Sequence, residues 1–282
     1  VRCGWHGDLE SVPAGFATEL AVIAGDNVRS CIDTWGALLR RRAGTVRPGR
    51  WPDALGSMPS YWTDNGAAYW YRTEPGHDPA AFADPVSGFP FRTKGGVLRI
   101  EARKDSAVNL SRPWRSGLLS SNDPKGHGFS LQYGYFEISA KLPGAKGVWP
   151  AFWLSTSSDR TDPNSAADGL IEIDVLEFYG FAEAYFAALH VWKPEPRHDG
   201  KIVNLPNRDA SKGFHTYGAL VTPEWIRFYR DRRETWRTRT PSEHKRPLMI
   251  LLNLALGGGW PIDGVPNPSY MLVDYVRAYA KP

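Results

Sequence analysis

One ten-residue stretch constrains the fold more than any other part of the chain. Residues 169–178 read GLIEIDVLEF, combining the branched aliphatic side chains typical of a β-strand with three carboxylates. Side chains alternate between the two faces of a strand, so Glu172 and Asp174 share one face and the intervening isoleucines the other. Glu177 breaks this alternation, because its odd separation from Glu172 directs its carboxylate into the core.

A β-bulge resolves the conflict. A buried, unpaired carboxylate is costly, and one extra residue at Val175–Leu176 shifts the alternation so that Glu177 rejoins Glu172 and Asp174. The two glutamates then lie roughly 13 Å apart between Cα atoms. Leaning together on a concave sheet, their carboxyl groups reach about 5–6 Å, the separation of a retaining glycosidase. A solvated edge strand and a cation site are the alternatives. The flanking aliphatic residues favour a central strand, and therefore catalysis.

Length and composition favour one large β domain. The chain has 282 residues, with 28 Gly, 23 Pro and 12 Trp, which indicates many short strands, many turns and an aromatic-lined surface. We predict a single β-sandwich catalytic domain over residues 1–282, with 1–60 as an N-terminal extension. The longest apolar run, 248–252, is too short to span a bilayer. No signal-peptide pattern is visible after Val1, and this absence says nothing about export.

The formal charge is only +4, but basic residues are clustered at 40–50 and 227–239. Solvated surface is the first interpretation of these clusters and an acidic ligand the second. Nucleic acid is not predicted, since no binding motif accompanies them. The cysteines are Cys3 and Cys31. A disulfide between them fits an exported protein, and two independent buried thiols are the alternative.

The chain beyond residue 90 reads as short strands separated by turns, which indicates an all-β antiparallel sandwich. A short helix is predicted near the start, capped by Asp33–Thr34. Residues 155–168 and 193–213 are predicted as loops. Besides the acidic segment, the predicted strands are 97–103, 131–142, 148–154, 184–192, 214–221, 225–231, 248–256 and 272–279.

Aromatic residues suggest where a sugar could bind. Trp149 and Trp153 share a strand face with an alanine between them, forming a slot in which a sugar ring stacks. Because the opposite face is also apolar, two core tryptophans remain the alternative. His190 falls on a neighbouring strand, where it can hydrogen-bond one of the acids and help set its protonation state. The aromatic segment 61–71 is either core or a sugar platform.

Several segments resemble glycoside hydrolase family 16. Glu172 to Glu177 resembles its bulged ExDxxE signature, as found in the laminarinase, agarase and carrageenase branches. The other resembling segments are 133–137 (YGYFE), 147–154 (GVWPAFWL), 214–217 (FHTY), 252–258 (LNLALGG) and 273–277 (VDYVR). Together they follow the family's order across roughly residues 90–280. The resemblance implies a β-jelly-roll sandwich of two antiparallel sheets with a concave substrate groove, and retaining endo-hydrolysis of β-linked glycans.

The resemblance also implies roles for individual residues. Glu172 is the implied nucleophile, Glu177 the acid/base, and Asp174 the residue that bonds the nucleophile and influences proton placement. The implied substrate-binding residues are Trp149, Trp153, Glu137, His190, Asn65, Asn253 and Trp260. No cofactor is implied for catalysis. A structural Ca²⁺ is implied on the convex side, with Asp274 as a ligand.

Two departures bear on the substrate. Ser139 stands where many members have arginine, and Asn65 is followed by Gly-Ala-Ala where laminarinases tend to have glutamate. Segments 116–121 and 128–134 look closest to bacterial members that cut exopolysaccharides such as succinoglycan. We therefore expect a secreted or periplasmic, monomeric enzyme that hydrolyses β-1,3 or mixed β-1,3/1,4 bonds, including those of an acidic exopolysaccharide. Neither nucleic acid nor a membrane is an expected partner. A non-catalytic lectin-like sandwich and a transglycosylase using the same site are the alternatives.

Overall fold

The computed structural model describes residues 28–43, 88–104, 114–162, 164–180 and 184–280. The chain divides into two compact units, 1–60 and 61–282, so the single domain over 1–282 stays a prediction. In the first unit, helix α1 spans Val28–Ala43. The predicted helix start at Asp33–Thr34 is wrong, because both residues lie inside α1, whose helical segment begins upstream at Val28. Cys31 is a free cysteine on α1, and Cys3 lies outside the described residues.

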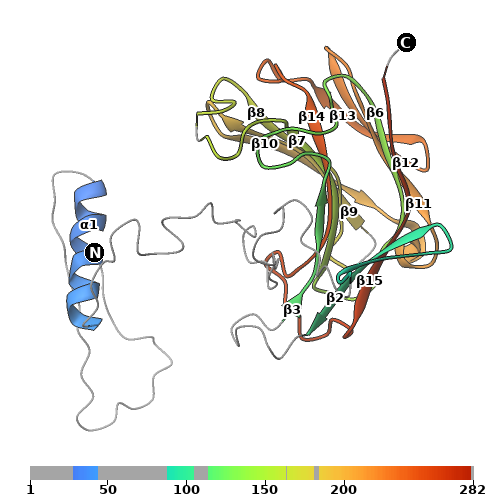
Figure 1. The fold of residues 1–282 in the computed structure, drawn as a ribbon, viewed down its shortest axis with the longest axis horizontal. Helices are drawn as coiled ribbons and strands as arrows, with labels where there is room; N and C mark the ends of the chain where they lie inside the picture. The colour runs from blue at the N-terminus through green and yellow to red at the C-terminus, as the bar shows by residue number, and fades with distance from the viewer. Residues whose placement is uncertain (1–27, 44–87, 105–113, 163, 181–183, 281–282) are drawn as a thin grey trace, which may run out of the picture. The chain divides into compact units, whose positions relative to one another are not determined.

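The second unit contains two antiparallel sheets that face each other (Figure 1). Their strands come from distant parts of the sequence, and both sheets use short hairpins and longer crossovers. The eight-stranded sheet has the order β1 (Phe91–Lys94), β2 (Val97–Lys104), β15 (Ser269–Tyr279), β6 (Gly134–Lys141), β11 (His215–Val221), β12 (Trp225–Arg230) and β13 (Arg233–Arg239), with β3 (Trp114–Arg115) on β2. The seven-stranded sheet has the order β10 (Arg197–Asn204), β9 (Ala184–Lys193), β8 (Leu170–Glu177), β7 (Val148–Thr156), β14 (Leu248–Leu256) and β4 (Leu118–Ser120), with β5 (Ser130–Leu131) on β14.

The hydrophobic core fills the space between the sheets. The inward face of β6 carries Phe136, Ile138 and Ala140, all fully buried, as the alternation in this segment predicts. Ile171 and Ile173 of β8 belong to the same core from the opposite sheet. Burying a side chain of this size contributes about 1.5–3 kcal/mol. The predicted sandwich of two antiparallel sheets is therefore confirmed.

Several strands escaped the sequence-based prediction: the short strands β1, β3 and β4, and the longer strands β10 and β13. Residues 193–213 were expected to be a loop, yet they contain β10 and a short 3₁₀ helix, η1 (Pro206–Ser211). Strand β13 occupies a segment interpreted as an arginine-rich surface. Both are edge strands, and nearly every side chain of β10 is exposed, so neither shows the apolar alternation by which strands are recognised.

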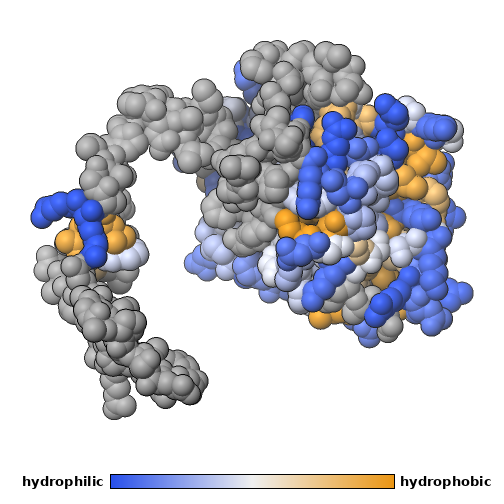
Figure 2. Space-filling model, turned by 90° about the horizontal axis from the view of Figure 1, so that it is seen from below, coloured by the Kyte–Doolittle hydropathy of each residue, from blue (hydrophilic) through white to orange (hydrophobic). Residues whose placement is uncertain are grey.

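Figure 2 shows one face of the molecule, on which hydrophilic residues surround smaller hydrophobic patches. Among the described residues, no helix is long and apolar enough to cross a membrane.

Candidate active site

The predicted bulge in the acidic strand is present. Between β7 and β8, Trp153 pairs with Asp174 whereas Phe152 pairs with Leu176, so Val175 is the extra residue. The pairing of β8 with β9 shifts at the same place. As a result Glu177 lies opposite Ala151, on the same outer face of the seven-stranded sheet as Glu172 and Asp174. We call this surface the acid face.

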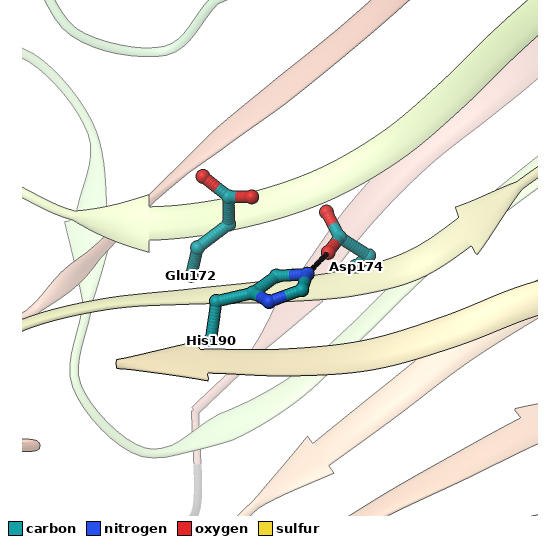
Figure 3. A group of neighbouring side chains, drawn as sticks. All are labelled: Glu172, Asp174 and His190. Atoms are coloured by element: carbon teal, nitrogen blue, oxygen red, sulfur yellow. Dashed lines mark ion pairs between the residues drawn. The ribbon is translucent and has the colours of Figure 1, made fainter. Parts of the chain in front are cut away.

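Asp174 forms the centre of the acid face and is held by a histidine. Its side chain is almost fully buried, and its Oδ2 lies 2.9 Å from His190 Nε2 (Figure 3). His190 stands directly opposite Glu172 in the pairing of β9 with β8. Its other ring nitrogen, Nδ1, lies 2.7 Å from Nδ1 of His198 on β10. Because one of two bonded nitrogens must donate, His198 constrains the tautomer of His190.

Glu172 occupies an environment that opposes its ionisation. Burial is the main cause that raises the pKa of Glu172, and the nearby Asp174 carboxylate raises it further. The His190 ring and a hydrogen bond from Trp192 Nε1 to Glu172 Oε2, 3.3 Å long, act in the opposite direction. The acid face therefore readily retains a proton, as expected for a cluster in which one carboxylate attacks and another donates a proton.

Glu177 is held by two donors at the other end of the acid face. Trp149 Nε1 and Tyr179 Oη both donate to its Oε1, at 2.9 and 3.2 Å. The two aromatic rings lie 5.6 Å apart. Gly258 has a φ of +60° and packs against both rings, so that a Cβ there would lie 2.7 Å from Tyr179 and 2.9 Å from Trp149. The glycine-rich segment after β14 thus supports the pair that orients Glu177.

Trp153 extends the acid face toward β14. Its Nε1 donates to Asn253 Oδ1 across 2.8 Å, and its ring packs on a small apolar cluster formed by Leu118, Met249 and Leu251. Trp149 and Trp153 are therefore neither free platforms nor purely core residues, since each indole N–H bonds a polar residue on this face. Trp260, on the loop after β14, is 37% exposed, and the Lys146 ammonium lies 5.3 Å from its ring centre.

One predicted substrate-binding residue lies elsewhere. Glu137 is on β6, in the eight-stranded sheet, and points outward because its neighbours Phe136 and Ile138 face the core. Its carboxylate accepts hydrogen bonds from Tyr135 and Tyr275, each 2.8 Å long. The prediction that Glu137 contacts substrate beside the acids is wrong, because the core separates it from the acid face. Ser139 shares its strand face, so it cannot act as a specificity residue there either.

Two further predictions stay untested. Asn65 and the aromatic segment 61–71 lie outside the described residues. Asp274 is exposed at a register shift in β15, and its Oδ2 accepts a bond from Ser139 Oγ at 3.4 Å. A calcium ion at Asp274 therefore remains a prediction. Among the described residues, a metal-compatible group consists of Glu172, Asp174 and His190, whose ligand atoms lie within 4.8 Å of one another.

Three residues of the acid face were not predicted to belong to it. Trp192 shares the strand face of His190, so the alternation of that strand could have identified it. His198 lies within the segment predicted as a loop, and Tyr179 follows the end of β8. No local sequence pattern identifies these two residues. The contacts of His198 depend on a strand that was not predicted, and those of Tyr179 depend on the path of the chain after β8.

A β-sandwich whose one sheet presents a row of carboxylates bordered by indoles has the architecture of a glycoside hydrolase. The chain belongs to glycosyl hydrolases family 16, whose family model matches residues 90–277.

Similar proteins agree with this assignment. The chain is 35% identical over 225 residues to the endo-1,3-1,4-beta-glycanase ExsH of Rhizobium meliloti. It is 34% identical over 238 residues to EglC of the same organism, which is also named an endo-1,3-1,4-beta-glycanase. These matches cover 77% and 79% of this chain, but only 44% and 47% of the two relatives, so the chain spans about half their length. The laminarinase catalytic domain of Thermotoga maritima shares the fold, with a TM-score of 0.59 and 24% identity over 70% of this chain and 82% of that one.

Proposed function

We propose that this protein is a retaining endo-β-glycanase that cleaves β-1,3 or mixed β-1,3/1,4 glycosidic bonds within a polysaccharide. The observation that carries the proposal is the bulge at Val175, which brings Glu172, Asp174 and Glu177 onto one face of a single strand. Each of these carboxylates is oriented by an aromatic N–H or an imidazole from a neighbouring strand. Binding alone would not require such a row.

In the first half of the reaction, Glu172 attacks the anomeric carbon and the bond to the leaving oxygen breaks. Glu177 gives its proton to that oxygen, so the leaving sugar departs as an alcohol and a covalent glycosyl-enzyme remains. Asp174 lies between the two glutamates, and its bond to His190 fixes its orientation. Burial and the Asp174 carboxylate favour a proton on Glu172 in the free protein, so attack requires that proton to pass to Glu177 and leave Glu172 ionised when substrate is bound.

In the second half, Glu177 acts as a base. It takes a proton from water, whose oxygen attacks the anomeric carbon from the face opposite Glu172 and releases the sugar with retained configuration. If another sugar hydroxyl replaces water, the same site performs transglycosylation. Every residue of this scheme comes from one chain, so the proposal requires no second subunit.

The substrate class is supported by the surroundings of the acids. Trp192, which is 39% exposed, and the partly exposed Trp153 border the acid face, and exposed indole rings stack on the apolar faces of sugar rings. The names of the two Rhizobium relatives support 1,3-1,4-β-glycan as the first substrate to test. Because an enzyme encounters polysaccharides of this kind outside the cytoplasm, a secreted or periplasmic location is part of the proposal.

Chemical rescue tests the two glutamate roles separately. With an aryl β-glucoside oligomer, whose leaving group needs no protonation, Glu177→Ala should still form the glycosyl-enzyme, and azide should trap it as the β-glycosyl azide. Glu172→Ala with azide should instead give the α-glycosyl azide. The opposite assignment of products would overturn the roles, and wild-type activity of either variant without azide would overturn the mechanism.

Two other functions make different predictions. A cation held by Glu172, Asp174 and His190 would make activity sensitive to chelation, whereas the proposal predicts the same rate before and after dialysis against EDTA. A lectin-like role predicts glycan binding without release of new reducing ends.

A further inference from the structure

The outer face of the eight-stranded sheet carries a group of arginines that the proposed reaction does not use. Strand β12 turns Ile226 and Phe228 into the core, and Trp236 of β13 packs against the same core, which leaves the alternate side chains of both strands pointing outward. We call this surface the arginine face, and it consists of Trp225, Arg227, Tyr229, Arg232, Arg237 and Arg239. It belongs to the sheet opposite the one that bears the acids.

The guanidinium groups on this face are ordered by aromatic rings. The Arg239 guanidinium lies 4.0 Å from the centre of the Trp225 ring, and that of Arg237 lies 5.3 Å from it. Nearby on β15, Arg277 lies 4.0 Å above Tyr275 in the same way. A guanidinium that contacts a ring through its flat side keeps its N–H groups available at its edge, the geometry that pairs two N–H donors with one carboxylate.

Positive charge on this face exceeds the negative charge that neutralises it. Glu234 forms ion pairs with both Arg227, at 3.6 Å, and Arg237, at 3.5 Å. Arg232 reaches the buried Glu137 at 3.4 Å, yet its own side chain is 68% exposed. Among the described residues, no carboxylate lies within ion-pair distance of Arg239. The face therefore offers exposed guanidinium edges to an external anion.

We propose that the arginine face is a second glycan-binding surface, which binds carboxylate-bearing segments of a polysaccharide while the acid face hydrolyses glycosidic bonds in the same polymer. This inference rests on the proposed function and narrows the substrate to an acidic β-glycan. Nucleic acid fits less well, because single strands bind through open aromatic platforms, whereas the Arg239 guanidinium already lies over the Trp225 ring. Attachment through a second face raises the local concentration of cleavable bonds without any change to the catalytic residues.

The test compares matched triple variants. Arg227→Gln/Arg237→Gln/Arg239→Gln removes three charges from the arginine face. Lys94→Gln/Lys212→Gln/Lys245→Gln removes three exposed charges elsewhere, at the far edge of the same sheet, after η1 and before β14. Both are made in the full chain, and thermal melts verify that each folds. Retardation is measured in native gels containing carboxymethyl β-1,3-glucan, neutral laminarin or DNA, and hydrolysis is measured on a short neutral β-glucan oligosaccharide and on the carboxymethyl polymer.

The arginine variant should bind the carboxymethyl glucan about tenfold more weakly than wild type, as expected for three lost surface contacts to carboxylates. Its KM on that polymer should rise with kcat unchanged, its rate on the oligosaccharide should equal that of wild type, and the lysine variant should behave as wild type throughout. Equal retardation of wild type and the arginine variant by the acidic glucan would overturn the inference, as would stronger retardation by DNA than by the glucan. If wild type cleaves no β-glucan at all, the proposed function itself fails, which the oligosaccharide assay reports separately.

Discussion

His198 of edge strand β10 lies 2.7 Å from His190 of β9, measured between their Nδ1 atoms. The contact extends the hydrogen-bonded chain from Asp174 through His190 to the edge of the sheet. If His190 donates from Nε2 to Asp174 as a neutral ring, its Nδ1 must accept a hydrogen from His198. His198 therefore acts as a positioning residue, through His190, on the carboxylate between the two glutamates.

Replacing His198 should reduce catalysis without preventing binding. His198→Phe keeps a ring at this position but removes the donor, so we expect kcat to fall on the order of tenfold and KM to stay within about twofold. His198→Asn, which retains a donor, should recover part of the rate. An unchanged kcat and an unchanged pH profile in the phenylalanine variant would show that the contact has no role in the reaction.

The bulge permits a prediction from a deletion variant. Deleting Val175 makes the separation of Glu172 and Glu177 even, so regular alternation keeps both on the acid face with the pairing to β7 unchanged. This variant should retain measurable hydrolysis, although loss of a buried valine should destabilise it by about 1.5–3 kcal/mol. Val175→Ala keeps the bulge and shortens the same buried side chain, so it is the matched control and should keep the wild-type rate of hydrolysis. A folded deletion variant that releases no new reducing ends would contradict this account of the bulge.

Glu172 should make folding stability depend on pH in a particular direction. Its pKa is raised in the folded protein above the ordinary value of 4.5, mainly by burial and next by Asp174. Below pH 4.5 the group is protonated in both folded and unfolded chains, so it has no effect on their balance. As pH rises above 4.5 toward the folded pKa, the unfolded chain ionises while the folded chain keeps its proton, so stability is lost progressively across this window and the loss is complete above the folded pKa.

Glu172→Gln cannot ionise and should escape this loss. Its melting temperature should equal that of wild type near pH 4 and exceed it increasingly toward pH 8, by about 2–4 °C for each kcal/mol. Calorimetry at several pH values gives the difference directly. A constant difference across this range would mean that the pKa of Glu172 is not raised by folding.

Glu137 should behave as a structural residue. Burial opposes its ionisation, but hydrogen bonds from Tyr275, Tyr135 and Arg232 outweigh burial and hold the pKa of Glu137 below its ordinary value. Its stabilising contribution is therefore present at neutral pH and lost as pH falls through the folded pKa. Glu137→Gln should lower the melting temperature at pH 7 by a few degrees, less at pH 3–4, and leave kcat/KM on a short oligosaccharide within twofold. A large loss of kcat/KM with an unchanged melting temperature would restore Glu137 to the substrate site.

The parts of the fold that the sequence predicted are those encoded in local patterns. Alternation correctly assigned the faces of β6 and β8, and the odd spacing of Glu177 was enough to predict the bulge. Strands β10 and β13 were missed because exposed edge strands lack an apolar face. Local patterns do not encode which strands are neighbours in space.

Because local patterns do not show which strands are neighbours, some residues of the site were misplaced or missed. Glu137 was assigned to the substrate through the family resemblance, whereas its position depends on which sheet β6 joins. His198 became visible only once β10 was seen to pair with β9. Residues on the acidic strand itself were predictable because one strand fixes their relative positions.

The central claim is that the row on β8 performs hydrolysis, and reducing-end release tests it most directly. Wild type, Glu172→Gln and Glu177→Gln would be compared on laminarin, mixed-linkage β-glucan, agarose, carrageenan and succinoglycan. We predict that wild type releases new reducing ends from at least one β-1,3- or β-1,3/1,4-linked polymer, and that both variants lose more than about a thousandfold of that rate. Full activity in Glu172→Gln, or glycan binding by wild type with no new ends from any polymer, would contradict the account.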